Sequence, residues 1–265
     1  MSNELKLHQS LSARLSFKVK KRNLENLENT SDVTHKSLKI SESEVSDYSN
    51  SRLDEQFFKK PCTVLGKSLL GKILCRRLSS GEILKGRVVE TECYLGEEDK
   101  ASHSYQGKIT ERNRAMFEKP GTVYVYKIYG MYHCFNISSL EEGSAVLIRS
   151  IEPLQGETLM QQLRSIKRKN DNLLKHKDLC NGPSKLCEAF KITKEELNMD
   201  DLSVSNNLWF EQGSDVSDII ACKRIGIDSC GDEWANKPLR FYVKDCVYVS
   251  IRNKQTEKNC SVQDL

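Results

Sequence analysis

The fold of this chain follows from two stretches in the middle of the sequence. Residues 88–96 read VVETECYLG, and residues 122–138 read TVYVYKIYGMYHCFNIS. In the first stretch polar and apolar side chains alternate, which predicts a β-strand with two different faces. One face carries Glu90, Glu92 and Tyr94, and the other carries Val89, Thr91, Cys93 and Leu95. The strand therefore presents two carboxylates and a phenol opposite an apolar surface.

The second stretch predicts a β-hairpin. The turn signal Lys119-Pro120-Gly121 precedes it, and strands over Thr122–Ile128 and Tyr132–Ser138 meet at Tyr129-Gly130-Met131. Gly130 can supply the positive φ that a tight turn needs. A tyrosine and a methionine at a hairpin tip gain nothing from a core, so we expect the tip to insert into another molecule.

Aromatic side chains are concentrated in this hairpin. Four of the nine tyrosines of the chain fall within nine residues: Tyr124, Tyr126, Tyr129 and Tyr132. Rings on strands usually fill a core, and the shared face of Tyr124 and Tyr126 fits that interpretation. Flat rings beside a carboxylate can also hold a flat, electron-rich ligand, for which a nucleobase is the obvious candidate.

Outward from these strands, short helical and extended segments follow one another. The expected helices cover Pro61 to about Leu70, about Glu111–Phe117, Glu157–Ile166 and a segment opened by Asn181-Gly182-Pro183-Ser184. The further expected strands cover residues 72–78, Ile83–Leu95, Ala145–Ile151, Ile219–Ile227 and Phe241–Ile251. This order predicts an α+β fold, built as a single compact domain on a mainly antiparallel sheet.

Composition divides the chain into a folded part and two tails. Residues 1–50 hold ten Ser, no Gly, no Pro and only two aromatic side chains, too little apolar surface to offset the entropy of ordering them. We expect a disordered N-terminal tail over residues 1–50, a folded domain over 51–252 and a flexible C-terminal tail over 253–265. The run KVKKR at residues 18–22 is typical of nuclear import, and Leu7, Leu11 and Leu15 at helical spacing are typical of a mitochondrial presequence. The nucleus is the expected compartment, with the mitochondrion as the alternative.

Charge and cysteine content narrow the functional class. The net charge is only +4, which gives little support to nucleic-acid binding by itself. Between Arg164 and Lys177, however, six basic residues accompany one acid, Asp171, and such a segment either contacts phosphates or is simply solvated. The ten cysteines form no Cys-x-x-Cys pair and no signal peptide precedes them, so we expect reduced thiols and no metal site. No apolar run reaches the length of a membrane span.

Six runs of sequence resemble a known family. They are VVETECYLG, SHS, RNRAMFEKPGTVYVYKIYGMYHCFNISS, VLIRSIEP, LCNGPSKLC and KPLRFYV. Together, across roughly residues 53–251, they closely resemble the alkyladenine (3-methyladenine) DNA glycosylases of the eukaryotic type. The resemblance implies a compact domain on a curved antiparallel sheet, with a hairpin that reaches into the DNA minor groove. It also implies removal of alkylated and deaminated purines from duplex DNA without a metal or an organic cofactor.

The resemblance points to one catalytic carboxylate. The family's catalytic residue matches Glu92, whereas strand alternation alone cannot separate Glu92 from Glu90. Cleavage of an N-glycosidic bond passes through an oxocarbenium-like sugar and needs an activated water, which a carboxylate can supply. Duplex DNA containing a damaged purine is the implied partner, and we expect a monomer to bind it.

The remaining implied roles concern the DNA. The family's base-binding residues match Tyr94, His103, Tyr126 and Asn136. Asn136 matches the residue that crowds out the exocyclic amine of a normal guanine. Tyr129 matches the side chain that enters the duplex in place of the flipped nucleotide, and Arg149 matches a polar residue near the catalytic water and the DNA backbone.

The chain departs from the common family pattern at two places. Tyr105-Gln106-Gly107-Lys108 stands where a stretch rich in Gly and Arg is usual, and Cys93 stands where a small residue is usual. The first difference lines the approach to the predicted pocket, so it concerns the preference among lesions. The second concerns packing.

Other functions compete with base excision. A protein that senses damage without cutting would keep Tyr129 and the basic segment but would not need Glu92. A hydrolase of free nucleosides would need Glu92 and the aromatic clamp, but neither the wedge nor the basic segment. A bifunctional glycosylase/lyase would carry a helix-hairpin-helix signature or a candidate Schiff-base lysine, and the sequence shows neither.

Overall fold

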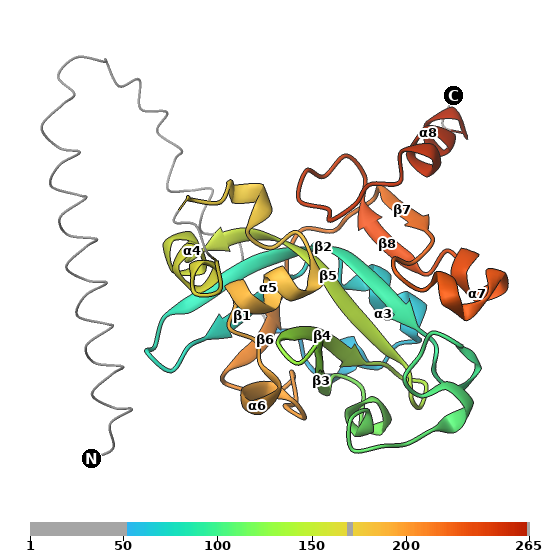
Figure 1. The fold of residues 1–265 in the computed structure, drawn as a ribbon, viewed down its shortest axis with the longest axis horizontal. Helices are drawn as coiled ribbons and strands as arrows, with labels where there is room; N and C mark the ends of the chain where they lie inside the picture. Colours follow the sequence, from blue (N-terminus) through green and yellow to red (C-terminus); the bar gives the residue numbers. More distant parts are fainter. Residues whose placement is uncertain (1–51, 169–171, 264–265) are drawn as a thin grey trace, which may run out of the picture. The chain divides into compact units, whose positions relative to one another are not determined.

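An antiparallel sheet of eight strands organises the chain (Figure 1). The structure is a computed structural model that describes residues 52–168 and 172–263, so the predicted tail over residues 1–50 and both of its candidate targeting signals lie outside the described residues. Six strands follow one another in the order β3-β4-β5-β2-β1-β6, and β8 pairs with β2 and β7. The sheet curls into half a barrel, which confirms the predicted α+β fold on a curved antiparallel sheet.

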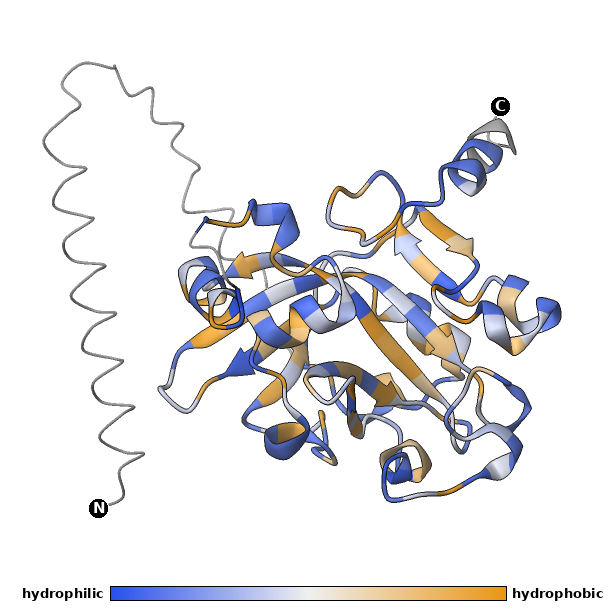
Figure 2. Cartoon of the chain, in the orientation of Figure 1, coloured by the Kyte–Doolittle hydropathy of each residue, from blue (hydrophilic) through white to orange (hydrophobic). Residues whose placement is uncertain are grey.

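The strands are short except for the two at the centre. Their bounds are β1 Ile73–Arg77, β2 Ile83–Tyr94, β3 Val123–Ile128, β4 Tyr132–Ser138, β5 Ala145–Gln155, β6 Leu208–Glu211, β7 Ile219–Cys222 and β8 Arg240–Val243. The central strands β2 and β5 pair along most of their length. Figure 2 shows β5 as a predominantly apolar strand in the middle of the sheet.

Strand β2 holds the sheet together because it pairs with three neighbours. One edge pairs with β5, while the other edge pairs with β1 over residues 83–87 and with β8 over residues 90–92. Residues 88–93 are all buried. The two carboxylates that the sequence places on this strand, Glu90 and Glu92, therefore lie in the interior of the protein rather than on a solvated face.

Two irregularities in the pairing of β2 with β5 direct the side chains of this region. Val89 on β2 and Arg149 on β5 have no direct partner across the ladder. Bulges of this kind increase the local twist and re-aim side chains. As a result, the guanidinium of Arg149 reaches both Glu90 and Glu92, two residues apart on β2.

Helices cover both faces of the sheet. Helix α3 (Cys62–Ser68) packs on β2 and β5, and helix α5 (Pro183–Ala189) packs on β4 and β5 and against α4 (Glu157–Ser165). Figure 1 shows α5 in front of the strands and α3 behind them. The other α-helices are α2 Glu55–Phe58, α6 Lys194–Leu197, α7 Asp232–Asn236 and α8 Lys254–Gln263, and five single turns of 3₁₀ helix complete the described elements.

The predicted elements are found with shifted ends. The helix expected from Pro61 begins at Cys62, since Pro61 occupies the position before the first helical residue. The helix expected around Glu111–Phe117 is a 3₁₀ turn over Arg114–Phe117. The last two strands are much shorter than expected: in the stretch predicted as Ile219–Ile227 only β7 is extended, because Gly226 turns the chain with a φ of +78°.

The C-terminal segment differs from the expected flexible tail. Residues 254–263 form helix α8, whose Glu257 is buried. Glu257 Oε1 accepts hydrogen bonds from the hydroxyl of Tyr242 on β8 and from Nε of Arg252, both at 2.9 Å. The helix has no continuous apolar stripe, so the sequence gives no periodic signal for it, and polar contacts fasten it to the sheet.

Nine of the cysteines have side chains that the structure describes, and all nine are free thiols. Seven of them are buried: Cys62, Cys75, Cys93, Cys134, Cys180, Cys187 and Cys222. Burial raises the pKa of most of these thiols, for example that of Cys180 to about 12 and that of Cys222 to about 11. The hydroxyl of Thr91 and the thiol of Cys93 donate to carbonyls of α3, so this face of β2 packs directly on that helix.

Close packing of α3 on β2 can be tested at Gly66. A Cβ at this position would lie 2.5 Å from Sγ of Cys93, so we expect Gly66→Ala to lower the free energy of unfolding by about 1–3 kcal/mol. Cys93→Ala removes the obstructing sulfur, so the double variant should recover most of that loss. Urea unfolding of the four proteins measures the coupling. Strictly additive losses would contradict the proposed contact.

Candidate active site

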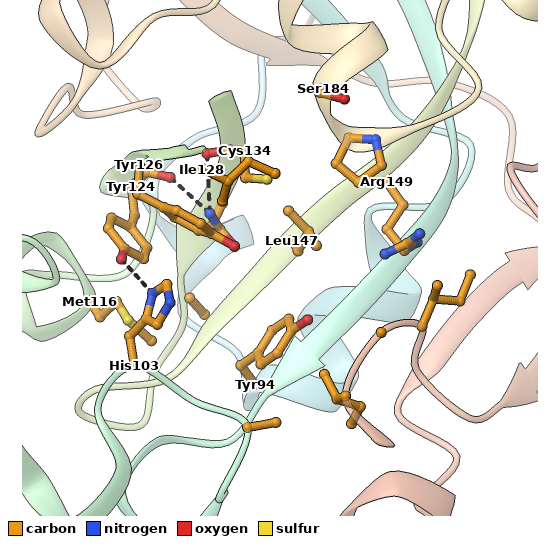
Figure 3. Close-up of a pocket in the computed structure, with 17 residues that line it drawn as sticks. Tyr94, His103, Met116, Tyr124, Tyr126, Ile128, Cys134, Leu147, Arg149 and Ser184 are labelled. Atoms are coloured by element: carbon orange, nitrogen blue, oxygen red, sulfur yellow. Dashed lines mark hydrogen bonds between the residues drawn. The ribbon is translucent and has the colours of Figure 1, made fainter. Parts of the chain in front are cut away.

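A cavity of about 370 Å³ opens on the face of the sheet that carries α5. Its walls come from the ends of β2 to β5, the loop before β3, the start of α5 and a segment after β7. The lining includes five of the predicted site residues: Tyr94, His103, Tyr126, Asn136 and Arg149. Figure 3 shows His103, Tyr124 and Tyr126 grouped on one side, with Tyr94 and Arg149 on the other.

One wall of the cavity is aromatic. Nδ1 of His103 lies 2.7 Å from the hydroxyl of Tyr124, which fixes the imidazole against the hairpin. The ring of His103 meets that of Tyr126 edge to face, with centroids 4.7 Å apart, and Tyr124 lies behind Tyr126 at 5.3 Å. The sequence left open whether these tyrosines form a core or a binding wall. Tyr124 does both, since it is buried and also lines the cavity.

His103 is a neutral imidazole at ordinary pH. The residue is exposed at the rim, yet its ring is enclosed by the tyrosines, and this desolvation lowers its pKa to about 4. The positive charge of Arg112 lowers the pKa further. The guanidinium carbon of Arg112 lies 5.1 Å from the centroid of the Tyr126 ring, so a cation borders the aromatic wall from outside.

The loop that carries His103 is held by Asn113. The side-chain amide of Asn113 donates to the carbonyls of His103 and Lys108, each at 2.8 Å. Gln106, within the stretch that departs from the family pattern, has a φ of +59°. The sequence carries no signal for this role of Asn113, because the role depends on backbone carbonyls in a loop without periodicity.

The opposite wall is formed by Tyr94. Its hydroxyl donates to Oε2 of Glu92 at 3.1 Å, and burial, followed by the charge of Glu92, raises its pKa well above the usual range, so it stays a neutral donor. The guanidinium of Arg224 lies 4.8 Å from the Tyr94 ring centroid. Arg224 is in turn bound by both carboxylate oxygens of Asp99, at 2.5 and 2.9 Å.

Glu92 lies directly behind these cavity residues. Its side chain is fully buried, with Oε1 accepting from the backbone N–H of Ile225 at 2.8 Å and Oε2 accepting from Arg149 Nη1 at 3.0 Å. Burial is the largest influence on its pKa and raises it, against the opposing effects of Arg149 and the Ile225 amide. The nearby charge of Glu90 also raises the pKa. Glu92 is therefore a carboxylate whose basicity is increased, in contact with two polar groups that line the cavity.

Asn136 presents an oxygen to the cavity. Its side-chain nitrogen donates to the carbonyls of Tyr124 and Cys134, at 3.1 and 3.4 Å. Because the two carbonyls, one on β3 and one on β4, occupy the amide hydrogens, the orientation of the side chain is fixed. A ligand at this point meets an acceptor and a rigid steric boundary.

Tyr129 is separated from the cavity and stands at the tip of the β3–β4 hairpin. Its side chain is 88% exposed, which is unusual for a large aromatic residue. Both Tyr129 and Gly130 have positive φ, 51° and 70°, and the N–H of Met131 bonds to the carbonyl of Ile128 at 3.2 Å. The left-handed conformation of Tyr129 was not predicted; such backbone strain in a non-glycine residue is often found at functional positions.

The basic segment over residues 164–177 is only partly available for phosphate. Arg164 is buried, pairs with Glu188 at 3.2 Å and donates to the carbonyl of Leu179. Lys167 points to the hairpin and donates to the carbonyl of Met131 at 2.7 Å. Lys169 and Asp171 lie outside the described residues. The segment therefore supports the hairpin tip as well as carrying charge.

The segment after β7 is the part of the site that sequence reasoning missed. It was expected to continue a strand, but Ile225, Gly226 and Ile227 line the cavity and Ile225 binds Glu92 through its backbone. Asp99 and Arg224, the buried ion pair behind Tyr94, were also not identified. Only the charge of Arg224 and the neighbouring glycine could have drawn attention to this run.

The structure shows neither a metal site nor a membrane-spanning helix in the described part of the chain. Within residues 52–168 and 172–263, no group of three or more His, Cys, Asp or Glu side chains is arranged to hold a metal ion. In that same part of the chain, no helix has the length and apolar character needed to cross a membrane.

Comparison with known proteins identifies the family. The family model of the methylpurine-DNA glycosylases matches residues 56–247. The chain belongs to this family. It is 50% identical over 210 residues to a probable DNA-3-methyladenine glycosylase of Encephalitozoon cuniculi, which covers 77% of this chain and 97% of that protein. It is 48% identical over 213 residues to the human DNA-3-methyladenine glycosylase, covering 78% of this chain and 71% of the human protein.

The likeness extends to bacterial proteins. A putative 3-methyladenine DNA glycosylase of Clostridium botulinum is 46% identical over 202 residues, covering 75% of this chain and 98% of that protein. The resemblance deduced from the sequence motifs is therefore confirmed. The residues that the family model matches include all those that line the cavity and form the hairpin.

The electrostatic effect of Arg112 on the aromatic wall can be measured. We expect His103 to titrate at about pH 4, and Arg112→Gln to move its pKa upward toward the ordinary value, because the variant removes a nearby positive charge. NMR titration of the His103 ring provides the measurement. Arg114→Gln, which removes an exposed charge paired with Glu118, is the matched control and should leave the titration unchanged. A wild-type His103 that titrates near its usual pKa would contradict the enclosed geometry.

Proposed function

We propose that this protein is a monofunctional DNA glycosylase that removes alkylated and deaminated purines from duplex DNA. The observation that carries the proposal is the buried Glu92, which lies directly behind an aromatic cavity and is bound by Arg149 and Tyr94, two residues that line it. Membership of the methylpurine-DNA glycosylase family supports the reaction class. The products are a free purine and an abasic site.

The target base has to leave the helix to enter the cavity. Extruding a nucleotide costs about a few kcal/mol in lost stacking and pairing, and a side chain that fills the gap offsets part of that cost. Tyr129 is suited to this role because it is exposed and is presented by a tight turn. The extruded purine would then lie between Tyr94 on one side and His103 and Tyr126 on the other.

The cavity suits purines that are damaged. Lesions such as 3-methyladenine and 7-methylguanine carry positive charge, and tyrosine faces attract a cationic ring by about 0.5–2 kcal/mol per contact. Hypoxanthine and ethenoadenine are neutral and would be held by stacking and shape. Normal guanine would be rejected because its exocyclic amine meets the fixed side chain of Asn136, as the family resemblance implies.

Glu92 would act as the general base. A water on the Arg149 side of the cavity gives a proton to the Glu92 carboxylate as its oxygen bonds to C1′ of the sugar. The electron pair of the N-glycosidic bond leaves with the purine, which departs as a neutral base when the lesion was cationic. Neutral lesions leave after they have gained a proton. Before the proton transfer is complete, the negative charge of the Glu92 carboxylate also stabilises the oxocarbenium-like sugar.

The role of Glu92 predicts a loss of activity with a defined pH dependence. We expect Glu92→Gln to lower single-turnover release of hypoxanthine by about a hundredfold or more, the usual contribution of a positioned base. Because burial raises the pKa of Glu92, the wild-type rate should fall as the pH drops through that raised pKa, above the usual range of a glutamate. Alkali cleavage at the abasic site measures both. Equal release by wild type and variant would exclude Glu92 as the base, and no release by the wild type from hypoxanthine, ethenoadenine or 3-methyladenine would exclude the enzyme.

The wedge can be tested separately from the chemistry. Tyr129→Ser should slow excision from duplex DNA by about tenfold or more, because the cost of extrusion is no longer offset, and should leave excision from single strands nearly unchanged. Leu140→Ser replaces another exposed apolar side chain, away from the hairpin, and serves as the control. An equal loss on both substrates would assign Tyr129 to the cavity rather than to the duplex. A wild type that prefers free nucleosides would instead favour the nucleoside-hydrolase alternative.

The biological setting is also a proposal. We propose that a monomer binds duplex DNA in the nucleus, with the mitochondrion as the alternative compartment, on the strength of the sequence signals in residues 1–22. Imaging of the full chain and of a variant with Lys18, Lys20, Lys21 and Arg22 replaced by Ser tests the compartment. Retained nuclear enrichment of the variant would contradict the role of the basic cluster.

A further inference from the structure

Glu90, the second carboxylate of β2, has no role in the proposed chemistry, yet it is among the most completely bound side chains of the described chain. It is fully buried. Oε1 accepts from Arg149 Nε at 3.1 Å, from Arg240 Nη1 at 2.8 Å and from the Ser250 hydroxyl at 2.9 Å, and Oε2 accepts from the Ser250 N–H at 2.7 Å. Its partners come from β5, from β8 and from the chain beyond β8.

One guanidinium joins Glu90 to Glu92. Arg149 donates from Nε to Glu90 and from Nη1 to Glu92 at 3.0 Å, so the two carboxylates compete for the same cation. Arg149 occupies a bulge on β5, where the ladder does not fix its direction. The contact with Glu90 supplies that direction, and it leaves Arg149 lining the cavity while it touches Glu92.

We propose that Glu90 is a positioning residue: anchored by Arg240 and Ser250, it holds Arg149 in place and withholds part of the Arg149 charge from Glu92, which keeps Glu92 an effective base. The inference rests on the proposed function and extends it from the general base, Glu92, to Glu90, which adjusts the basicity of Glu92.

The charges around Glu92 determine the sign of the effect. Arg149 on β5 and the Ile225 amide lower its pKa, and burial and Glu90 raise it. Tyr94 donates to it from β2, and Arg224 lies behind Tyr94, paired with Asp99. Arg240 on β8 is the cross-strand neighbour of Glu92, but its guanidinium binds Glu90 rather than Glu92. Removing the charge of Glu90 should therefore make Glu92 a weaker base, and removing that of Arg240 should make it a stronger one.

Two variants, Glu90→Gln and Arg240→Gln, should shift the pH profile of the reaction in opposite directions, which distinguishes a positioning role of Glu90 from a purely structural one. In Glu90→Gln the acid limb of the single-turnover pH profile should move down by about one pH unit, with a plateau rate about tenfold lower. In Arg240→Gln the acid limb should move up. Glu152→Gln is the matched control, because Glu152 pairs with Arg87 across the same two strands, away from the cavity, and should leave the profile unmoved. Loss of folding alone cannot move the two profiles in opposite directions.

The pKa of Glu92 can also be followed directly, without measuring enzyme activity. Carbon-13 NMR of labelled glutamate side chains follows the titration of Glu92 in the wild type and in each variant, with Glu92→Gln identifying the resonance. Failure of the wild type to release any base would overturn the proposed function, while the NMR shifts would still decide the role of Glu90. Unchanged Glu92 titration in Glu90→Gln, or shifts of the same sign in both variants, would overturn the inference. If Glu90→Gln does not fold, the direction of the Arg240→Gln shift decides.

Discussion

The structure depends on the burial of two carboxylates on one strand. A buried charge without a partner costs several kcal/mol, so β2 can carry Glu90 and Glu92 only where arginines and N–H groups meet them. Arg149, Arg240, Ser250 and the Ile225 amide meet this need from four separate parts of the chain. The bulge on β5, the docking of β8 and the turn after β7 all bring those groups into place. The elements around β2 are thus arranged so that they supply the partners that the two buried carboxylates need.

The hairpin of β3 and β4 links the cavity to the exposed ring of Tyr129. Tyr126 and Asn136 face the cavity from its two strands, and Tyr129 stands at its tip. One hydrogen-bonded ladder connects the cavity residues to the tip of the hairpin. The distance between the cavity and the ring of Tyr129 is therefore set by strand geometry rather than by a long loop. Lys167 reinforces the tip by binding the carbonyl of Met131. In the proposed reaction, this single local element would couple extrusion of a base to its binding in the cavity.

Alternation along the chain predicted much of this arrangement, because a period of two determines which side chains share a face. It placed Glu90, Glu92 and Tyr94 together and located the hairpin correctly. It could not distinguish the two glutamates, since both face the same way and their charged partners, Arg149 and Arg240, lie 57 or more positions away. The Ile225 contact uses backbone atoms, which leave no side-chain signature. Helix α8 escaped prediction for a related reason: a polar helix held by a buried carboxylate carries no hydrophobic period.

The free thiols have a consequence for the conditions in which such a protein works. Thiolates are the side-chain nucleophiles that methylating electrophiles attack most readily, and thiols react far more slowly. Seven of the nine cysteines whose side chains the structure describes are buried, and burial raises the pKa of Cys75, Cys93, Cys180, Cys187 and Cys222. A protein that acts on alkylated DNA is exposed to the agents that alkylate it. Burial thus keeps these thiols protonated and slow to react, and in the proposed function it would protect them from the agents that alkylate the substrate.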